Sequence, residues 1–302
     1  MCEKWRRGVE MTDVFIIGKG PAGISAALYT ARAGFSTVVT GYSKGSLGKA
    51  EKIENYYGFA EPVSGEELFE NGIRGAKRLG VTVLDEEVFS VSYDGNFKIQ
   101  TDAGEHESEV LIIAAGSVRK SLPVKGLKEF EGAGVSYCAV CDAFFHRGND
   151  VAVIGNGAYA VSEAEHLAGV VNKVFILTDG KEMEAKVPEN IVIRGGKIAE
   201  ISGEQTVSKV IFEDGSEICV SGVFVAMGNA GSTDLGRKLG VVDPQGNWMI
   251  SENGSTPLPG LYAAGDCTGG LLQISKAVSD GAEAGTAAAK YLREKRKNRG
   301  KL

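Results

Sequence analysis

A glycine-rich motif occurs twice in the chain, at a constant separation of 137 positions. Residues 13–27 read DVFIIGKGPAGISAA, and residues 150–164 read DVAVIGNGAYAVSEA. Each copy combines an apolar run typical of a buried parallel strand, a Gly-x-Gly-x-x-Gly/Ala turn and an Ala-rich stretch typical of a helix. In such a turn the first glycine permits the bend, the second lets the backbone approach a pyrophosphate, and the third lets helix pack on strand.

One such match would fit a structural turn as well as a nucleotide site, but the repeat in the same strand–turn–helix context favours dinucleotide binding. A further apolar run closes each copy, at residues 36–40 and 174–178. The start of each helix offers N–H groups and the positive end of the helix dipole to phosphates. The duplication therefore predicts two Rossmann-type units in an α/β chain.

A later segment has the same order of strand and helix. Residues 256–270 read TPLPGLYAAGDCTGG, where an apolar strand ends at Gly265 and Asp266, and a long Ala-rich helix is expected from about 275 to 290. The Asp266 carboxylate can accept a hydrogen bond from a cofactor hydroxyl, or it can cap a helix. We expect a discontinuous first domain (11–117 and 246–302), an inserted second domain (118–245) and an N-terminal extension (1–10).

Composition excludes several classes of function. A net charge of −6 with no basic face argues against nucleic-acid binding. No apolar run reaches the ~18 residues needed to span a bilayer, and the N-terminus does not read as a secretion signal. Five cysteines in such a chain indicate a reducing, cytoplasmic location. We expect the basic stretch after Tyr291 to be a solvated end rather than a binding arm.

A close cysteine pair, Cys138-Ala139-Val140-Cys141, precedes the second glycine motif and is followed by Asp142. A tetrahedral zinc site would need two further ligands. The remaining cysteines and histidines lack ligand spacing: Cys2, Cys219, Cys267, His106, His146 and His166. The spacing instead suits a reducible disulfide with a depressed thiol pKa. Asp142 can transfer the proton that thiol–disulfide exchange requires, or it can cap the next turn.

The order and content of these motifs resemble low-molecular-weight thioredoxin reductases over nearly the whole chain. The matching segments are GKGPAG (18–23), IENYYGF (53–59), LIIAAG (111–116), GVSYCAVCDAFF (134–145), the second glycine loop and GLYAAGD (260–266). The resemblance implies an α/β fold of two Rossmann-like nucleotide-binding domains, of the two-dinucleotide-binding flavoprotein type, with the second domain inserted in the first. It also implies FAD as cofactor.

Carried over by position, the resemblance places the FAD pyrophosphate on Gly18, Gly20 and Gly23, the isoalloxazine near Asn55 and the ribityl chain at Asp266. Further cofactor contacts are expected from the neighbouring motif positions: Pro21, Ala22, Gly41, Leu47, Val88, Ala115, Gly116, Gly265, Gln273, Lys276 and Ala277. No metal is expected.

The resemblance also assigns the redox chemistry. Cys141 takes electrons at the flavin, Cys138 attacks the disulfide of a partner, and Asp142 acts as acid and base. Thioredoxin is the implied partner, and a homodimer is the implied assembly. Two alternatives stay open, a flavin-dependent oxidase of small dithiols and a non-catalytic flavin redox sensor.

Several positions depart from the NADPH-dependent pattern. Where those members have a His-Arg-Arg…Arg run for the 2′-phosphate, this chain has TDGKEM at 178–183. An acidic residue there repels a phosphate, although Asp179 suits a ribose hydroxyl. The following stretch leaves room for a helix of two turns at most.

The segment 227–234 lacks the proline that is usual in the family, and Ser275-Lys276-Ala277 replaces Arg-Gln-Ala. These departures resemble the atypical reductases that use reduced ferredoxin or a reduced deazaflavin. NADPH is disfavoured as the donor, and the sequence does not separate these donors from one another or from NADH.

Overall fold

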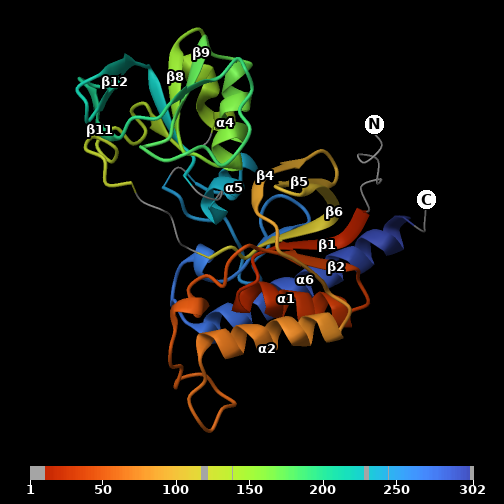
Figure 1. The fold of residues 1–302 in the computed structure, drawn as a ribbon. Helices are drawn as coiled ribbons and strands as arrows, with labels where there is room; N and C mark the ends of the chain where they lie inside the picture. The colour runs from red at the N-terminus through yellow and green to blue at the C-terminus, as the bar shows by residue number, and fades with distance from the viewer. Residues whose placement is uncertain (1–10, 117–121, 138, 228–230, 244, 300–302) are drawn as a thin grey trace, which may run out of the picture. The chain divides into compact units, whose positions relative to one another are not determined.

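The computed structural model describes residues 11–116, 122–137, 139–227, 231–243 and 245–299 (Figure 1). Contacts divide these residues into two compact units. The first contains the described residues up to 116 and those from 231 onward, and the second contains those between 122 and 227. The chain therefore returns to the first unit at 231, whereas the boundary expected from the motifs lies at 246.

The first unit is built on a sheet with the strand order β3-β2-β1-β6-β5-β4, in which β15 also pairs with β6. Its strands are β1 (Met11–Ile17), β2 (Thr37–Thr40), β3 (Thr82–Leu84), β4 (Val88–Tyr93), β5 (Phe97–Thr101), β6 (Gly104–Ile113) and β15 (Leu261–Ala263). Ile17 at the end of β1 is in register with Thr40 of β2 and Ile113 of β6. The carboxyl ends of these parallel strands therefore meet at one edge.

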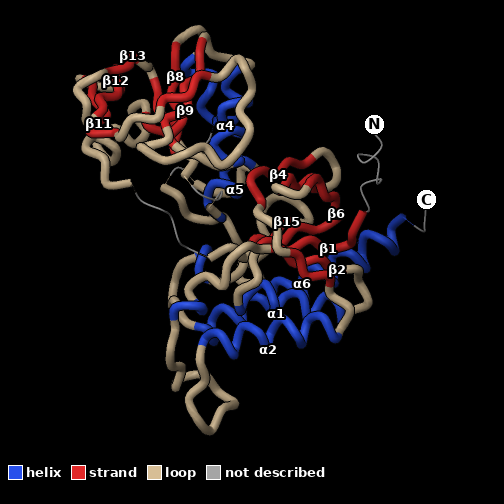
Figure 2. The backbone as a smooth tube through the Cα atoms, in the orientation of Figure 1, coloured by secondary structure: helices blue, strands red, loops and turns tan. Residues whose placement is uncertain are grey.

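Helices α1 (Pro21–Arg32), α2 (Gly65–Arg78) and α6 (Ile274–Arg299) lie on one side of this sheet (Figure 2). Val14 and Ile16 of β1 face these helices, because side chains alternate along a strand and this face carries the core. The short elements are α5 (Ser232–Lys238) and the 3₁₀ helices η1 (Leu47–Lys49) and η3 (Asp266–Thr268).

The basic stretch after Tyr291 is largely exposed to solvent, as expected, but it is not a free end. It forms the last turns of α6, which extends well beyond the predicted 275–290. Lys295 and Arg299 lie 3.0 and 3.2 Å from the buried Glu109 carboxylate of β6, and Arg296 pairs with Asp13. The cations therefore hold the end of α6 against the sheet.

The second unit contains a five-stranded sheet with the order β10-β9-β8-β14-β7, in which every pair is parallel. Its strands are β7 (Val135–Ser136), β8 (Asp150–Ile154), β9 (Lys173–Leu177), β10 (Val192–Arg194) and β14 (Gly222–Val225). An antiparallel sheet of β11 (Ile198–Gly203), β12 (Val207–Phe212) and β13 (Glu217–Cys219) completes the strands. The helical elements are α3 (Ala139–Asp142), η2 (Ala143–His146) and α4 (Ala158–Ala168).

The connection from β9 to β10 contains no helix. Parallel neighbours usually require a crossover helix, and the sequence left room for a short one. The structure instead has a turn at Asp179 and Gly180, followed by irregular backbone to residue 191. This connection lies beside the second glycine motif.

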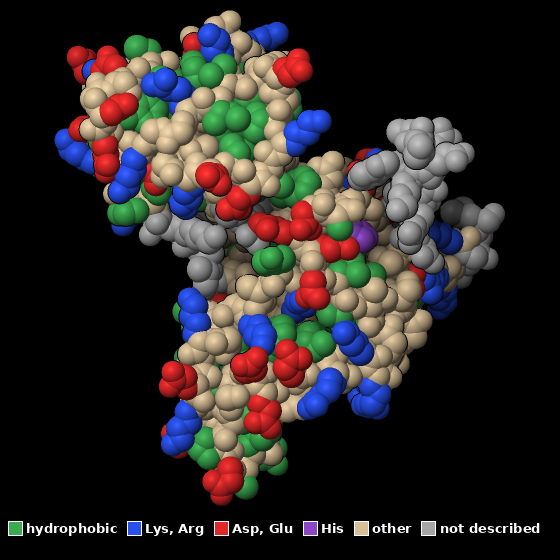
Figure 3. All heavy atoms as spheres, in the orientation of Figure 1, with side chains coloured by type: hydrophobic (Ala, Val, Ile, Leu, Met, Phe, Trp, Pro, Cys, Tyr) green, Lys and Arg blue, Asp and Glu red, His purple; other side chains and the backbone are tan. Residues whose placement is uncertain are grey.

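No helix within the described residues is long and apolar enough to cross a bilayer. The face drawn in Figure 3 carries acidic and basic side chains in close alternation, as the small net charge of −6 suggests.

Candidate cofactor and redox site

The first glycine loop leaves an open cradle at the start of α1. A Cβ at Gly18, whose φ is +118°, would lie 2.1 Å from the Ala114 carbonyl oxygen, and one at Gly23 would lie 1.8 Å from the Gly18 carbonyl oxygen. These two glycines are required for close packing. A Cβ at Gly20 would meet no atom within 4 Å, and no side chain caps the helix. The space above Gly20 is therefore free for a phosphate group.

Lys19 is a residue of this loop that the sequence reading missed. Its side chain is only 6% exposed and forms an ion pair with Asp85, which follows β3. The hydrogen bond from Lys19 holds the pKa of Asp85 below its usual range. The ion pair fixes a cation between two of the loop glycines. In the sequence, the only sign of this role was the position of Lys19 within GKGPAG.

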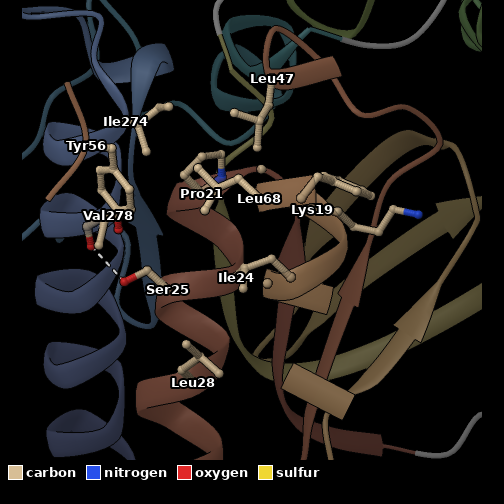
Figure 4. A pocket seen from close by; sticks show the side chains of 13 residues that line it. Lys19, Pro21, Ile24, Ser25, Leu28, Leu47, Tyr56, Leu68, Ile274 and Val278 are labelled. Carbon is tan, nitrogen blue, oxygen red and sulfur yellow. Dashed lines mark hydrogen bonds between the residues drawn. The ribbon is translucent and has the colours of Figure 1, made fainter. Parts of the chain in front are cut away.

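A cavity of about 170 Å³ opens beside the loop (Figure 4). Its lining is mostly apolar and comes from the glycine loop, α1, η1, the loop before α2, α2 and α6: Lys19, Gly20, Pro21, Ile24, Ser25, Leu28, Leu47, Tyr56, Leu68, Phe69, Gly72, Ile274 and Val278. The Ser25 hydroxyl is satisfied, because it donates to the Val278 carbonyl at 2.7 Å. In Figure 4 the Lys19 side chain extends away from Ser25 and Val278. Gly20, Pro21 and Leu47 are the predicted cofactor residues in this lining.

Two further predicted residues, far apart in the sequence, lie together. The Asn55 side-chain amide donates to the Gln273 side-chain oxygen at 3.0 Å. Gly265 packs beside the loop as well, since a Cβ there would lie 2.7 Å from that of Ala22 and 3.9 Å from that of Ala277. The first glycine motif and the late GLYAAGD segment therefore form one site.

Asp266 does not cap a helix. Gly265 occupies the N-cap position of η3, and no side chain caps that turn. Asp266 is the first residue of η3 and is half-buried, and its carboxylate accepts no hydrogen bond from the described residues. A half-buried carboxylate that finds no partner in the described part of the chain suits a ligand hydroxyl.

Lys276 is held in place at the start of α6. Its ammonium lies 2.6 Å from the Asp280 carboxylate and donates to the Thr268 hydroxyl at 3.0 Å. The same Asp280 oxygen accepts from the Gly265 amide at 3.0 Å. This cluster joins the first turn of α6 to the strand end that precedes Asp266.

The remaining predicted cofactor residues lie at the ends of strands of the same sheet. Gly41 comes after β2, and its amide donates to the Leu84 carbonyl at 3.3 Å. Ala115 and Gly116 come after β6, and the Ser232 hydroxyl donates to the Gly116 carbonyl at 2.6 Å. Val88 begins β4 and is buried. Because this edge carries the open glycine loop, the residues present fit a dinucleotide such as FAD.

Of the cysteine pair, Cys138 lies outside the described residues, and so does the side chain of Cys141. The backbone of Cys141 belongs to α3, whose first amide, at Ala139, donates to the Glu163 carboxylate at 2.9 Å. Glu163 comes from α4 and is 1% exposed. A buried carboxylate therefore anchors the turn between the two cysteines.

Asp142 is oriented by a hydroxyl rather than used as a cap. The Ser136 hydroxyl donates to the Asp142 carboxylate at 2.6 Å, and Asp142 makes no side-chain bond to the amides of η2. Nearby, His146 contacts the Ser221 hydroxyl at 2.9 Å. Burial lowers the pKa of His146, and the charge of Asp142 opposes this only in part. His146 therefore remains neutral near pH 7.

Asp179 also has a structural partner. It is in the left-handed region with φ of 51°, and its carboxylate accepts from the Ile198 amide at 2.9 Å. One of its two oxygens is thus engaged within the protein. The described residues hold no group of three or more His, Cys, Asp or Glu side chains that could bind a metal ion.

The two parallel sheets and the open glycine loop define a dinucleotide-binding protein. Comparison with known proteins agrees with this class. The sequence pattern of the pyridine nucleotide-disulphide oxidoreductases matches residues 12–281. The thioredoxin reductase of Aquifex aeolicus (strain VF5) is 36% identical over 306 residues, with 94% of each chain covered. That of Listeria monocytogenes (serovar 1/2a, strain EGD-e) is 36% identical over 307 residues, with 93% of this chain and 94% of the relative covered.

Among solved structures, the atypical thioredoxin reductase TRi from Desulfovibrio vulgaris Hildenborough has a TM-score of 0.86 and 40% identity, covering 94% of this chain and 98% of its own. A ferredoxin-flavin thioredoxin reductase from Clostridium acetobutylicum has a TM-score of 0.68 and 32% identity, covering 94% and 99%. The chain belongs to the low-molecular-weight thioredoxin reductase family. It is a thioredoxin reductase-like, FAD-dependent oxidoreductase, so the predicted family and fold class are confirmed.

Proposed function

We propose that this enzyme reduces the disulfide of thioredoxin through FAD and the Cys138/Cys141 pair, with a donor other than NADPH. The observation that carries the choice of donor is the connection between β9 and β10. It has no helix, and residues 178–191 contain no arginine. Membership of the family supports the remainder of the proposal.

The residues that would hold FAD lie at the carboxyl edge of the first sheet. Gly20 and the start of α1 would receive the pyrophosphate, and Asp266 would accept a hydrogen bond from the ribityl chain. Lys19, whose charge is paired with Asp85, would support the loop beside the phosphates, and the Asn55–Gln273 pair would border the isoalloxazine. When bound, FAD supplies a redox centre that exchanges one or two electrons.

The cysteine pair carries the exchange with the partner. In the dithiol state the Cys138 thiolate attacks one sulfur of the partner disulfide, and the other sulfur leaves as a thiolate that takes a proton. The Cys141 thiolate then attacks Cys138, which re-forms the internal disulfide and releases the second partner thiol. Asp142, oriented by Ser136, is the proposed acid and base for these protons.

The charges of the β9–β10 connection oppose a 2′-phosphate. Such a group is normally held by arginines, whose planar fork matches it. The connection offers two lysines against several carboxylates: Lys181 and Lys186 against Asp179, Glu182, Glu184 and Glu189. At an effective dielectric of about 20, one carboxylate ~4 Å from a phosphate charge costs on the order of 4 kcal/mol, roughly a thousandfold in affinity.

The proposed donors are reduced ferredoxin or a reduced deazaflavin. One of the structural relatives is described as a ferredoxin-flavin thioredoxin reductase, and its likeness covers 94% of this chain. The proposal includes a homodimer, on the family resemblance alone.

The test is anaerobic reduction of the purified holoenzyme, followed by stopped-flow absorbance, with each donor in turn. We expect fast bleaching of the flavin by reduced ferredoxin or reduced deazaflavin and very slow bleaching by millimolar NADPH. NADH should be no slower than NADPH. Micromolar-affinity reduction by NADPH would overturn the choice of donor.

Single variants test the route to thioredoxin. Cys138→Ser and Cys141→Ser should each leave flavin reduction intact and abolish thioredoxin turnover, whereas Cys219→Ser, an exposed position in β13, should change neither. Near-normal thioredoxin turnover in either of the first two variants would refute the assignment of the pair.

A further inference from the structure

The second glycine loop is covered by a segment of its own unit. The Glu184 amide donates to the Asn156 carbonyl at 2.8 Å. In return the Asn156 side-chain amide donates to the Glu184 carboxylate at 3.0 Å and to the Glu182 carbonyl at 3.0 Å. Asn156 lies between the two loop glycines and is only 8% exposed. We call residues 178–184 the acidic strap.

The strap places a carboxylate where the motif places a phosphate. Gly157 is the second glycine of the motif, the position at which the backbone approaches a pyrophosphate. A Cβ built at Gly157 would lie 4.0 Å from a Glu184 carboxylate oxygen, and α4 begins directly after it. At the equivalent Gly20 of the first unit, nothing lies within 4 Å. The two copies of the motif therefore differ in whether the phosphate position is free.

The strap is held at both ends of its turn. The Lys181 amide donates to the Thr178 carbonyl at 3.1 Å, and Asp179, at φ of 51°, is fixed by the Ile198 amide. The β9–β10 connection contains no helix, and its first residues are held against the loop by the bonds to Asn156 instead.

We propose that Glu184 is a specificity-determining residue, whose carboxylate takes the place of a ligand phosphate and closes the second unit to pyridine dinucleotides. This inference rests on the proposed function and gives a residue-level cause for its choice of donor. A dinucleotide would have to displace the three hydrogen bonds to Asn156 and bring its phosphates beside a negative charge. NADH and NADPH are both excluded by this contact, because it acts on the pyrophosphate that they share.

The test is equilibrium binding of NADH to the oxidised holoenzyme, measured by isothermal titration calorimetry. Glu184→Ala removes the carboxylate, and Glu182→Ala is the matched control, because it removes an equal charge from the strap while its bond to the loop comes from the backbone carbonyl. The wild type and Glu182→Ala should bind no tighter than ~1 mM, and Glu184→Ala should bind about tenfold tighter or more. Equal affinity in all three proteins would overturn the inference, and so would tight binding by the wild type.

Glu184→Gln gives a second measurement that does not depend on the alanine variant. It keeps an acceptor for Asn156 and removes the charge, so it should gain part of the affinity of Glu184→Ala. If neither Glu184→Gln nor Glu184→Ala binds NADH more tightly than the wild type, a role for the carboxylate is refuted. Because calorimetric binding requires no turnover, failure of the inference would leave thioredoxin reduction unchanged, whereas failure of the proposed function would appear as absent turnover with every donor.

Discussion

Two free cysteines among the described residues lie in opposite surroundings. The Cys267 sulfhydryl donates to the Ala264 carbonyl at 3.3 Å and to the Ile113 carbonyl at 3.6 Å. Burial raises the pKa of the Cys267 thiol to about 12. Cys219 is exposed at the end of β13. Because the thiolate is the reactive form, we expect the half-buried Cys267 to be unreactive despite its position next to Asp266.

We therefore predict that iodoacetamide at pH 8 modifies Cys219 readily and leaves Cys267 unmodified in the folded protein. Peptide mass spectrometry after timed quenching gives the two rates, and denatured protein, in which both thiols react, is the control. Cys267→Ser should retain bound flavin and thioredoxin turnover, because a hydroxyl can donate to the same carbonyls. Equal labelling rates in the folded protein would show that the Cys267 thiol is accessible and ionised.

At the residue scale, sequence reasoning located the site but did not always identify its contacts. For both Asp142 and Asp266 a helix cap was a reasonable alternative, and the structure shows neither. The partner of Asp142 is Ser136, six residues earlier, which only the fold of the turn brings within reach. Lys19 was missed because its partner, Asp85, is 66 residues away and its burial depends on that pairing.

At the scale of elements, α1 and α6 pack through glycines. A Cβ at Gly281 would lie 2.1 Å from the Ala22 carbonyl oxygen, and one at Gly285 would lie 2.7 Å from the Ala26 carbonyl oxygen. The two helix backbones therefore approach more closely than any larger residue permits. By contrast, a Cβ built at Gly75, inside α2, would meet no atom within 4 Å.

These glycines predict opposite outcomes for one kind of substitution. Gly281→Ala should destabilise the protein by roughly 1–3 kcal/mol, because the methyl group forces the helices apart. Gly75→Ala should stabilise it by about 0.5–1 kcal/mol, because alanine has the higher helix propensity and no neighbour obstructs it. Urea unfolding of the holoenzyme gives both values. A Gly281→Ala variant as stable as the wild type would contradict the packing described for α1 and α6.

The repeated motif correctly predicted β1 with α1 and β8 with α4, because strand, turn and helix are each encoded locally. The β9–β10 connection was harder to predict. Its length indicated at most a short helix. In the structure the connection is bound instead by Asn156 and Ile198 from elsewhere in the unit, and no local pattern signals such partners.

For the whole molecule, each of the two units has a core of its own. A ligand that binds only one unit stabilises that unit by mass action. We predict that added FAD raises the melting temperature of one transition in differential scanning calorimetry and leaves a second transition unmoved. Asp266→Ala should reduce the FAD-dependent increase, since losing a partner for a cofactor hydroxyl costs ~1–3 kcal/mol. If FAD raises the melting temperature equally in the wild type and the variant, Asp266 does not bind the cofactor.

The order of motifs was sufficient to predict that one domain interrupts the other, because a strand and helix of the first type return after the second glycine loop. The position of the return was not encoded in any motif. Helix α5 belongs with the first unit through tertiary bonds, from Ser232 to the Gly116 carbonyl and from Lys238 to the Phe89 carbonyl at 3.5 Å. Such contacts have no signature in the local sequence.

The packing of α6 on α1 has a consequence for how the protein is made. Ser25 in α1 and Val278 in α6 are joined by a hydrogen bond across 253 positions of the chain. During synthesis, β1 and α1 leave the ribosome well before α6, so they wait for their covering helix while the intervening residues are translated. The second unit is continuous in sequence and can fold in the meantime. The growing chain therefore exposes an unfinished apolar surface until α6 has been made, and a chaperone that binds apolar surface would act on the nascent first unit rather than on the second.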